Sequence, residues 1–177
     1  MPFNPTESRL SSRWLAAYHG GGAIGATSQT FTVGRVFLQL FEVKEPCYVD
    51  QIVYVVGGTQ AGSIVVGIYG PVTTEETANS TVLLFGTDPA LNSQDPANGP
   101  HAINPTTSFA LRPGRYYVAV EGASQAGSYM RQGNQTQVSG WAAYYDRVGA
   151  FGALTDPCPT TTATGSALPA VKIRTVV

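Results

Sequence analysis

The sequence predicts an all-β protein, an antiparallel jelly roll or β-sandwich with long irregular loops and a short N-terminal arm. β-branched and aromatic residues gather in short runs, and Gly- and Pro-rich breaks separate these runs. No stretch has the apolar repeat of an amphipathic helix of ordinary length. With 177 residues the chain can bury a real core. We divide it into residues 1–29, an arm with a first strand, and residues 30–177, the jelly-roll domain.

The stretch of residues 46–69 is the centre of the expected fold. Two β-branched, aromatic-rich runs flank a Gly-rich break, which is the composition of a strand, a short connection and a second strand, a hairpin. Side chains alternate along a strand, so Val53 and Val55 share one face of the first run and three other apolar side chains share the opposite face. Because both faces are apolar, we expect this strand inside a sandwich or under a partner subunit.

Further strands are expected from the same alternation, at residues 31–43, 82–86, 116–121 and 170–176. Residues 13–18 fit either a short strand or a helical turn. The Pro-rich connection over residues 87–107 is expected to lack structure of its own and to have a functional or contact role. The Gly- and Thr-rich part over residues 121–170 holds five aromatic side chains, so we expect it to be folded over the sandwich or into a neighbour.

The charge content of the chain favours a subunit of an assembly. Charged residues make up 12% of the sequence, about half of the ~25% usual in soluble domains. Neutral surface of this extent is usually covered by neighbouring subunits, although a Gly- and Thr-rich all-β monomer is the simpler alternative. The net charge is −1 and no basic cluster occurs, so we expect no nucleic-acid partner.

Nothing in the sequence predicts export or a membrane span. The first residues lack a basic segment followed by an apolar one, and no run approaches the ~20 apolar residues of a membrane helix. Cys47 and Cys158 have no metal-type spacing. A chain made without a secretion signal meets a reducing cytosol, which favours free thiols, with a Cys47–Cys158 bond as the alternative.

The residues that could support catalysis are few and scattered. His19 and His101 each lie in a Gly- or Pro-rich loop, where a histidine is more often solvated than catalytic. No nucleophile elbow, phosphate-binding loop or dinucleotide-binding glycine motif is present. We therefore assign no catalytic or cofactor-binding residue and expect no enzyme activity.

The acidic residues do not form an obvious pair or metal site. Glu75 and Glu76 are neighbours in a loop and would point in different directions. Asp50 and Glu121 lie on expected strands and could approach as a glycosidase pair does, but pairing of Asp50 with an arginine, or a turn cap, is the commoner outcome. The remaining candidates are too scattered for a calcium site, and these are Asp88, Asp95 and Asp156.

Aromatic side chains are the strongest candidates for contact with a partner. Aromatics are enriched in protein interfaces, but they also fill cores and stack on sugars, and all three uses stay open. Tyr144 and Tyr145 on one strand would point to opposite faces. The interface candidates are Trp14, Tyr18, Val53, Val55, Trp141, Tyr144, Tyr145 and Phe151.

Several structural motifs follow one another along the chain. In order, these are Val49-Asp50-Gln51-Ile52, a Gly-rich turn, Gly67-Ile68-Tyr69, a long polar loop, Leu111-x-Pro113-Gly114-x-Tyr116-Tyr117-Val118-Ala119-Val120, and Pro169-x-Val171-x-Ile173-Arg174. This order resembles a jelly-roll module that recurs in virion proteins of tailed bacteriophages. The resemblance covers roughly residues 30–177.

The resemblance implies a non-enzymatic structural protein, commonly trimeric, that acts as a head decoration (cement) protein or as a piece of a tail fibre or tail tip. Its partners would be copies of itself and the major capsid protein or tail proteins. It would reside in the virion after assembly in the host cytoplasm. Family members often carry a charged residue where Val53 or Val55 stands, so this face would be more apolar here. The alternative is a tail adhesin that binds a host-surface glycan.

Overall fold

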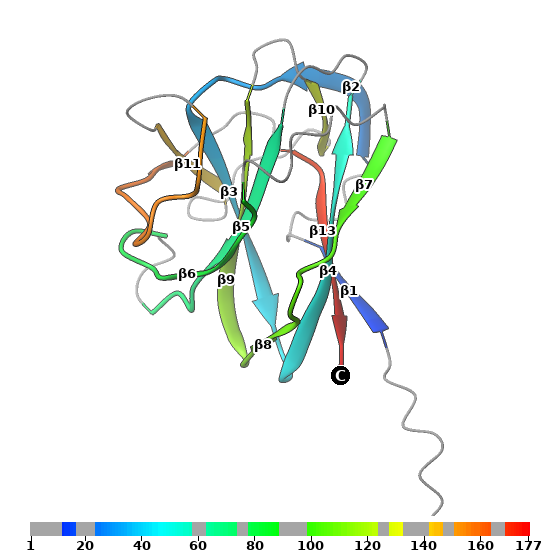
Figure 1. The fold of residues 1–177 in the computed structure, drawn as a ribbon, viewed down its shortest axis with the longest axis vertical. Helices are drawn as coiled ribbons and strands as arrows, with labels where there is room; N and C mark the ends of the chain where they lie inside the picture. Colours follow the sequence, from blue (N-terminus) through cyan, green and yellow to red (C-terminus); the bar gives the residue numbers. More distant parts are fainter. Residues whose placement is uncertain are drawn as a thin grey trace, which may run out of the picture.

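The computed structural model describes residues 12–16, 24–57, 63–73, 78–88, 99–123, 128–132, 142–146, 151–163 and 169–177. In these residues the protein is all-β, with every strand pair antiparallel and no helix. Two sheets, A and B, lie face to face (Figure 1). The expected all-β sandwich is confirmed at this level.

Sheet A has seven strands and is built around β4. The path β1-β13-β4-β10-β2 runs through it, and β7 and β8 also pair with β4. Its strands are β1 (Ser12–Ala16), β2 (Ile24–Thr30), β4 (Cys47–Val56), β7 (Gly99–Ile103), β8 (Phe109–Leu111), β10 (Ser128–Gln132) and β13 (Val171–Val176).

Sheet B has six strands in the order β12-β11-β3-β9-β5-β6. These strands are β3 (Arg35–Val43), β5 (Ile64–Tyr69), β6 (Leu83–Gly86), β9 (Gly114–Gly122), β11 (Ala142–Asp146) and β12 (Thr162–Ala163). Alternate side chains of β9 and β13 face inward, as their period of two predicts. Tyr116, Val118 and Val120 pack between the sheets, as do Val171 and Ile173.

The expected hairpin over residues 46–69 is wrong, although both of its strands exist. β4 lies in sheet A, where Ile52 is opposite Ile173 of β13, whereas β5 lies in sheet B, where Val66 is opposite Val120 of β9. The reason is burial. All six residues of β5 are buried, and a strand that is apolar on both faces is stable only where both faces of its sheet are covered. Sheet B offers that environment.

Two apolar clusters lie on the two faces of sheet B. The inner cluster fills the space between the sheets, and β3 contributes Phe37, Phe41 and Val43 to it. The outer cluster lies on the far side, where β3 contributes Val36, Leu38 and Leu40 as the alternation predicts.

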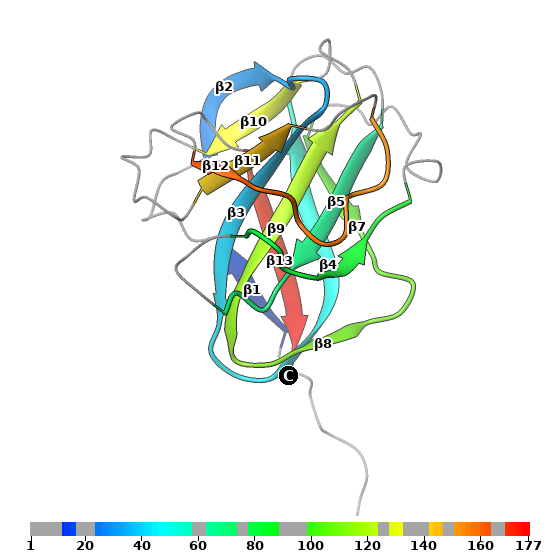
Figure 2. The same ribbon diagram turned by 90° about the vertical axis from the view of Figure 1, so that its left-hand side faces the viewer.

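The chain itself covers the outer cluster. Ala78, Leu154 and Cys158 are buried against it. Figure 2 looks onto this side and shows the orange segment of residues 151–163 crossing in front of β9. The centre of sheet B is therefore buried on both faces within the chain itself.

Two segments for which no strand was predicted contain strands. β7 falls within the connection over residues 87–107 and pairs with β4, with Pro100 opposite Val55. Among the described strands β7 pairs with β4 alone, and proline is tolerated at such an edge because a missing N–H costs nothing there. In the part from residue 121 to 170, β10, β11 and β12 extend the two sheets.

Candidate functional site

The outer face of sheet A differs from that of sheet B because large apolar side chains remain exposed on it. Trp14 of β1 is 52% exposed and Tyr48 of β4 is 53% exposed. Leu15 packs against the inner cluster and Val49 belongs to it, so by alternation their neighbours Trp14 and Tyr48 point outward. We call this surface face A.

A hollow of about 300 Å³ lies on face A. Four strands or their ends supply its lining, which is apolar except for one ammonium group. The lining residues are Trp14, Val53, Val55, Pro100, Ala170, Val171 and Lys172. Its volume is at the lower end of the range of small ligand sites, ~300–1,000 Å³, and it would also accept one or two side chains of a partner.

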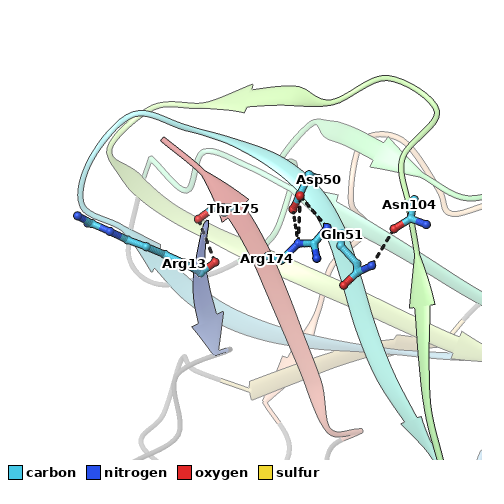
Figure 3. Close-up of polar contacts among 6 residues, drawn as sticks. All are labelled: Arg13, Asp50, Gln51, Asn104, Arg174 and Thr175. Carbon is cyan, nitrogen blue, oxygen red and sulfur yellow. Dashed lines mark hydrogen bonds and ion pairs between the residues drawn. The ribbon is translucent and has the colours of Figure 1, made fainter. Parts of the chain in front are cut away.

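The polar side chains next to the hollow are paired (Figure 3). Arg174 places Nε 3.0 Å from both carboxylate oxygens of Asp50 and Nη2 2.8 Å from one of them. This hydrogen bonding to Asp50 raises the pKa of Arg174. Gln51 donates from Nε2 to Oδ1 of Asn104 at 2.9 Å. The Arg174 guanidinium carbon lies 5.9 Å from the centroid of the Trp14 ring, within cation–π range.

A β-bulge positions Asp50 for this contact. Gln51 is opposite Arg174, but the next pair along β13 is Thr175 with Val49, so Asp50 is the additional residue. A bulge of this kind re-aims a side chain and increases the local twist. The expectation that Asp50 pairs with an arginine is confirmed.

Lys172 is the one ionisable residue in the lining of the hollow. It is exposed, and no carboxylate of the described residues forms an ion pair with it. Face A therefore combines an apolar depression with one positive charge that lacks a counter-charge within the described part of the chain.

Of the eight interface candidates, the structure brings Trp14, Val53 and Val55 together in the hollow. Val53 and Val55 are half-buried. Tyr18 and Trp141 lie outside the described residues. The other three candidates belong to sheet B or its cover and lie away from face A.

Tyr144 and Tyr145 point to opposite faces of β11, as expected. Tyr144 packs against the inner cluster, and the Arg35 guanidinium carbon lies 3.9 Å from its ring centroid. Arg35 also binds Asp146 with Nε 2.8 Å from Oδ1, and this hydrogen bond raises the pKa of Arg35.

Tyr145 belongs to the core of the fold, so it offers no surface to a partner. It is 2% exposed, and its hydroxyl lies 3.0 Å from the Tyr69 hydroxyl, which donates to the Thr155 carbonyl oxygen at 2.7 Å. Burial raises the pKa of both tyrosines. Phe151 is half-buried against the outer cluster.

The residues considered for catalysis do not converge in the described part of the chain. Asp50 lies on face A, whereas Glu121 alternates with Tyr117 and Ala119 on the outer side of sheet B, so these two carboxylates are separated by the sandwich. The His101 ring stacks on Tyr54 with centroids 5.7 Å apart. No group of three His, Cys, Asp or Glu side chains in the described ranges could hold a metal ion. His19, Glu75, Glu76 and Asp95 lie outside those ranges.

The two cysteines are free and buried. Cys47 belongs to the inner cluster and Cys158 to the outer one, so sheet B separates them. Burial raises the pKa of the Cys47 thiol and raises that of Cys158 to about 12.

Sequence reasoning missed Tyr48, Pro100 and Lys172. Simple alternation puts Tyr48 on the same face as Ile52, which is buried, but the bulge at Asp50 reverses the phase and turns Tyr48 outward. Pro100 was assigned to a loop. Alternation along residues 170–176 predicts that Lys172 faces outward, but it does not predict that Lys172 lines a hollow.

No helix in the part of the chain that the structure describes has the length and apolar character to cross a bilayer. No protein-family model matches the chain, and no curated protein matches it.

Proposed function

We propose that the chain is a non-enzymatic structural protein of a tailed-phage virion, a trimeric jelly-roll subunit that stabilises the head as a decoration (cement) protein. The observation that carries this proposal is the contrast between the two outer faces. The chain covers the outer face of sheet B with its own segments, and it leaves Trp14 and Tyr48 about half exposed on face A.

Burial of face A would contribute substantial free energy to assembly. Full burial of a large apolar side chain is worth about 1.5–3 kcal/mol, and Trp14, Tyr48, Val53 and Val55 are each only partly buried in one subunit. The Asp50–Arg174 pair would enter the contact with each charge already matched, which offsets part of the cost of its desolvation. Contacts of this kind repeated around a shell add through multivalency.

The path of the chain supports the jelly-roll assignment. It passes from sheet B to sheet A between β3 and β4, and returns to sheet B at β5. The last strand, β13, lies between β1 and β4. Strands that alternate between two packed sheets fit a jelly roll, which is a double-sheet fold.

The proposal is tested in two steps. Sedimentation velocity at micromolar concentration should give the mass of an oligomer, and a stable monomer would contradict assembly through face A. Electron microscopy of particles labelled with gold on this protein should then show label distributed over the head. Label confined to the tail would contradict the decoration role and favour the tail.

A second candidate is a tail adhesin that binds a host-surface glycan, and one specific feature favours it. The half-exposed indole of Trp14 borders a hollow, and the Asp50–Arg174 and Gln51–Asn104 pairs lie beside it as hydrogen-bonding groups (Figure 3). A sugar ring could stack on the indole while its hydroxyls contact these groups. A glycan array probed with the wild type and with Trp14→Ala tests this: binding that depends on Trp14 supports the adhesin, and an array without signal argues against it.

A further inference from the structure

A second exposed apolar group lies at the free edge of sheet B. Val82 is 55% exposed and Leu84, in the edge strand β6, is 40% exposed. Between them, the backbone N–H of Leu83 donates to Oδ1 of Asp156 at 3.0 Å. We call Val82, Leu84 and Asp156 the β6 patch.

The β6 patch and the hollow of face A have opposite charges, and neither charge has an ion-pair partner among the described residues. Asp156 is exposed, and no basic side chain of the described residues forms an ion pair with it. Lys172, at the hollow, likewise forms no ion pair with a carboxylate of the described residues. Six other charges on the described strands and turns form three pairs: Arg13 with Glu45, Arg35 with Asp146, and Arg174 with Asp50.

The segment that carries Asp156 is fixed by backbone hydrogen bonds. Ser80 donates to the carbonyl of Cys158 at 2.8 Å, and Cys158 donates to the carbonyl of Thr81 at 2.9 Å. The hydrogen bond from the Tyr69 hydroxyl to the Thr155 carbonyl oxygen also fixes this segment against β5. A patch that is ordered before binding loses little conformational entropy on association, which favours specific contact.

The two surfaces lie on different sides of the molecule. Figure 1 shows β6 on the side of sheet B and the strands of face A on the opposite side. A two-fold dimer uses one patch against itself, whereas contact between two different patches is head-to-tail, and it either closes into a ring or continues as a filament. The trimer proposed above is such a ring.

We infer that face A receives the β6 patch of a second copy of this chain, with Val82 and Leu84 against the hollow and Asp156 paired with Lys172. The inference rests on the proposed function, since it names the partner of face A in the assembly. Each copy would bury one hollow and one β6 patch, so every hollow and every β6 patch of a closed ring would be covered. The contact needs no other protein.

Charge reversal tests the inference. Lys172→Glu and Asp156→Lys each put two like charges at the contact, and we expect each to weaken self-association about tenfold or more in sedimentation velocity. The double variant, Lys172→Glu with Asp156→Lys, exchanges the signs and should restore association toward that of the wild type. Lys44→Glu is the matched control, because Lys44 is the other lysine of the chain, is exposed, and lies outside the hollow.

A third change tests the apolar part of the contact without altering charge. Leu84→Ser should weaken association, while urea unfolding of the same sample shows whether the subunit still folds.

Each result has one meaning. An oligomer that persists in Lys172→Glu, in Asp156→Lys and in Leu84→Ser overturns this contact and leaves the structural function standing. Single variants that dissociate without rescue in the double variant also overturn the pairing, since each residue would then act on a different group. A wild-type monomer overturns the assembly proposal itself. Rescue in the double variant, with Lys44→Glu unchanged, establishes the contact.

Discussion

Replacing Tyr69 with Phe removes one oxygen atom from the centre of the outer cluster. Tyr69 lies in β5, is fully buried, and contacts the covering segment through its hydroxyl. A hydroxyl has one proton, and that of Tyr69 is donated to the Thr155 carbonyl. The Tyr145 hydroxyl must therefore be the donor in the 3.0 Å contact between the two tyrosines. The substitution removes an acceptor and a donor together.

The expected loss of stability follows from these two hydrogen bonds. The bond to Thr155 is worth about 0.5–1.5 kcal/mol net, and the buried Tyr145 hydroxyl left without its acceptor costs about 1–3 kcal/mol. The free energy of unfolding of Tyr69→Phe should thus fall by about 1.5–4.5 kcal/mol. For a chain of this length the Tm falls by roughly 2–4 °C per kcal/mol.

Urea unfolding followed by circular dichroism measures this loss, with equal m-values required for a valid comparison. Tyr144→Phe is the matched control, because it deletes the same atom from the chain neighbour of Tyr145, whose ring lies under the Arg35 guanidinium. We expect the control to change stability by less than about 0.5 kcal/mol. If Tyr69→Phe costs no more than Tyr144→Phe, the two tyrosines do not hold the cover of sheet B and the reasoning fails.

Three more predictions follow from the core. Burial raises the pKa of Cys158 from 9.0 to about 12, so its protonated form stabilises the fold fully below pH 9, and this contribution is lost as pH rises toward 12. In urea titrations over that window, the free energy of unfolding of the wild type should fall by up to about 1.4 kcal/mol per pH unit relative to that of Cys158→Ala. Parallel curves for the two proteins would contradict the burial argument. Because Cys47 and Cys158 are free in separate clusters, dithiothreitol should leave the Tm unchanged; a drop of several degrees would reveal a disulfide. In Gly67→Ala the new Cβ would collide with Leu154 and lie 2.7 Å from the Phe85 carbonyl oxygen, which should lower the free energy of unfolding by about 1–3 kcal/mol. Gly86→Ala, where the nearest contact of the new Cβ is a flexible leucine methyl at 3.2 Å, should lose clearly less stability in the same urea assay. Equal losses in the two variants would contradict the geometry.

Local alternation predicted the faces of strands that are regular. It was correct for β3, where Phe37 and Leu38 lie in different clusters, and for β13, where Ile173 is buried and Lys172 exposed. It failed at Asp50, since a bulge adds one residue and reverses the phase for every residue on one side of it. Nothing in the local composition distinguishes a bulged strand from a regular one.

Pairing between distant strands was beyond the reach of local patterns. Two apolar runs separated by a Gly-rich break fit both a hairpin and a connection that crosses from one sheet to the other. The pairing of β4 with β13 and of β5 with β9 produces the crossing. The same limit applies to the hollow. Trp14 and Val53 were both candidates, but their proximity depends on β13 lying between β1 and β4.

The position of β13 also affects how the protein can be made. Of the described strands it is the last to leave the ribosome, and both β1 and β4 need it as a neighbour. Until it emerges, β4 has a bare edge along most of its length and β1 has no partner among the described strands, so the nascent sandwich is open on that side. A chain stopped by a premature codon before Val171 should accordingly collect in inclusion bodies, whereas one that ends just after Val176 should remain in the supernatant.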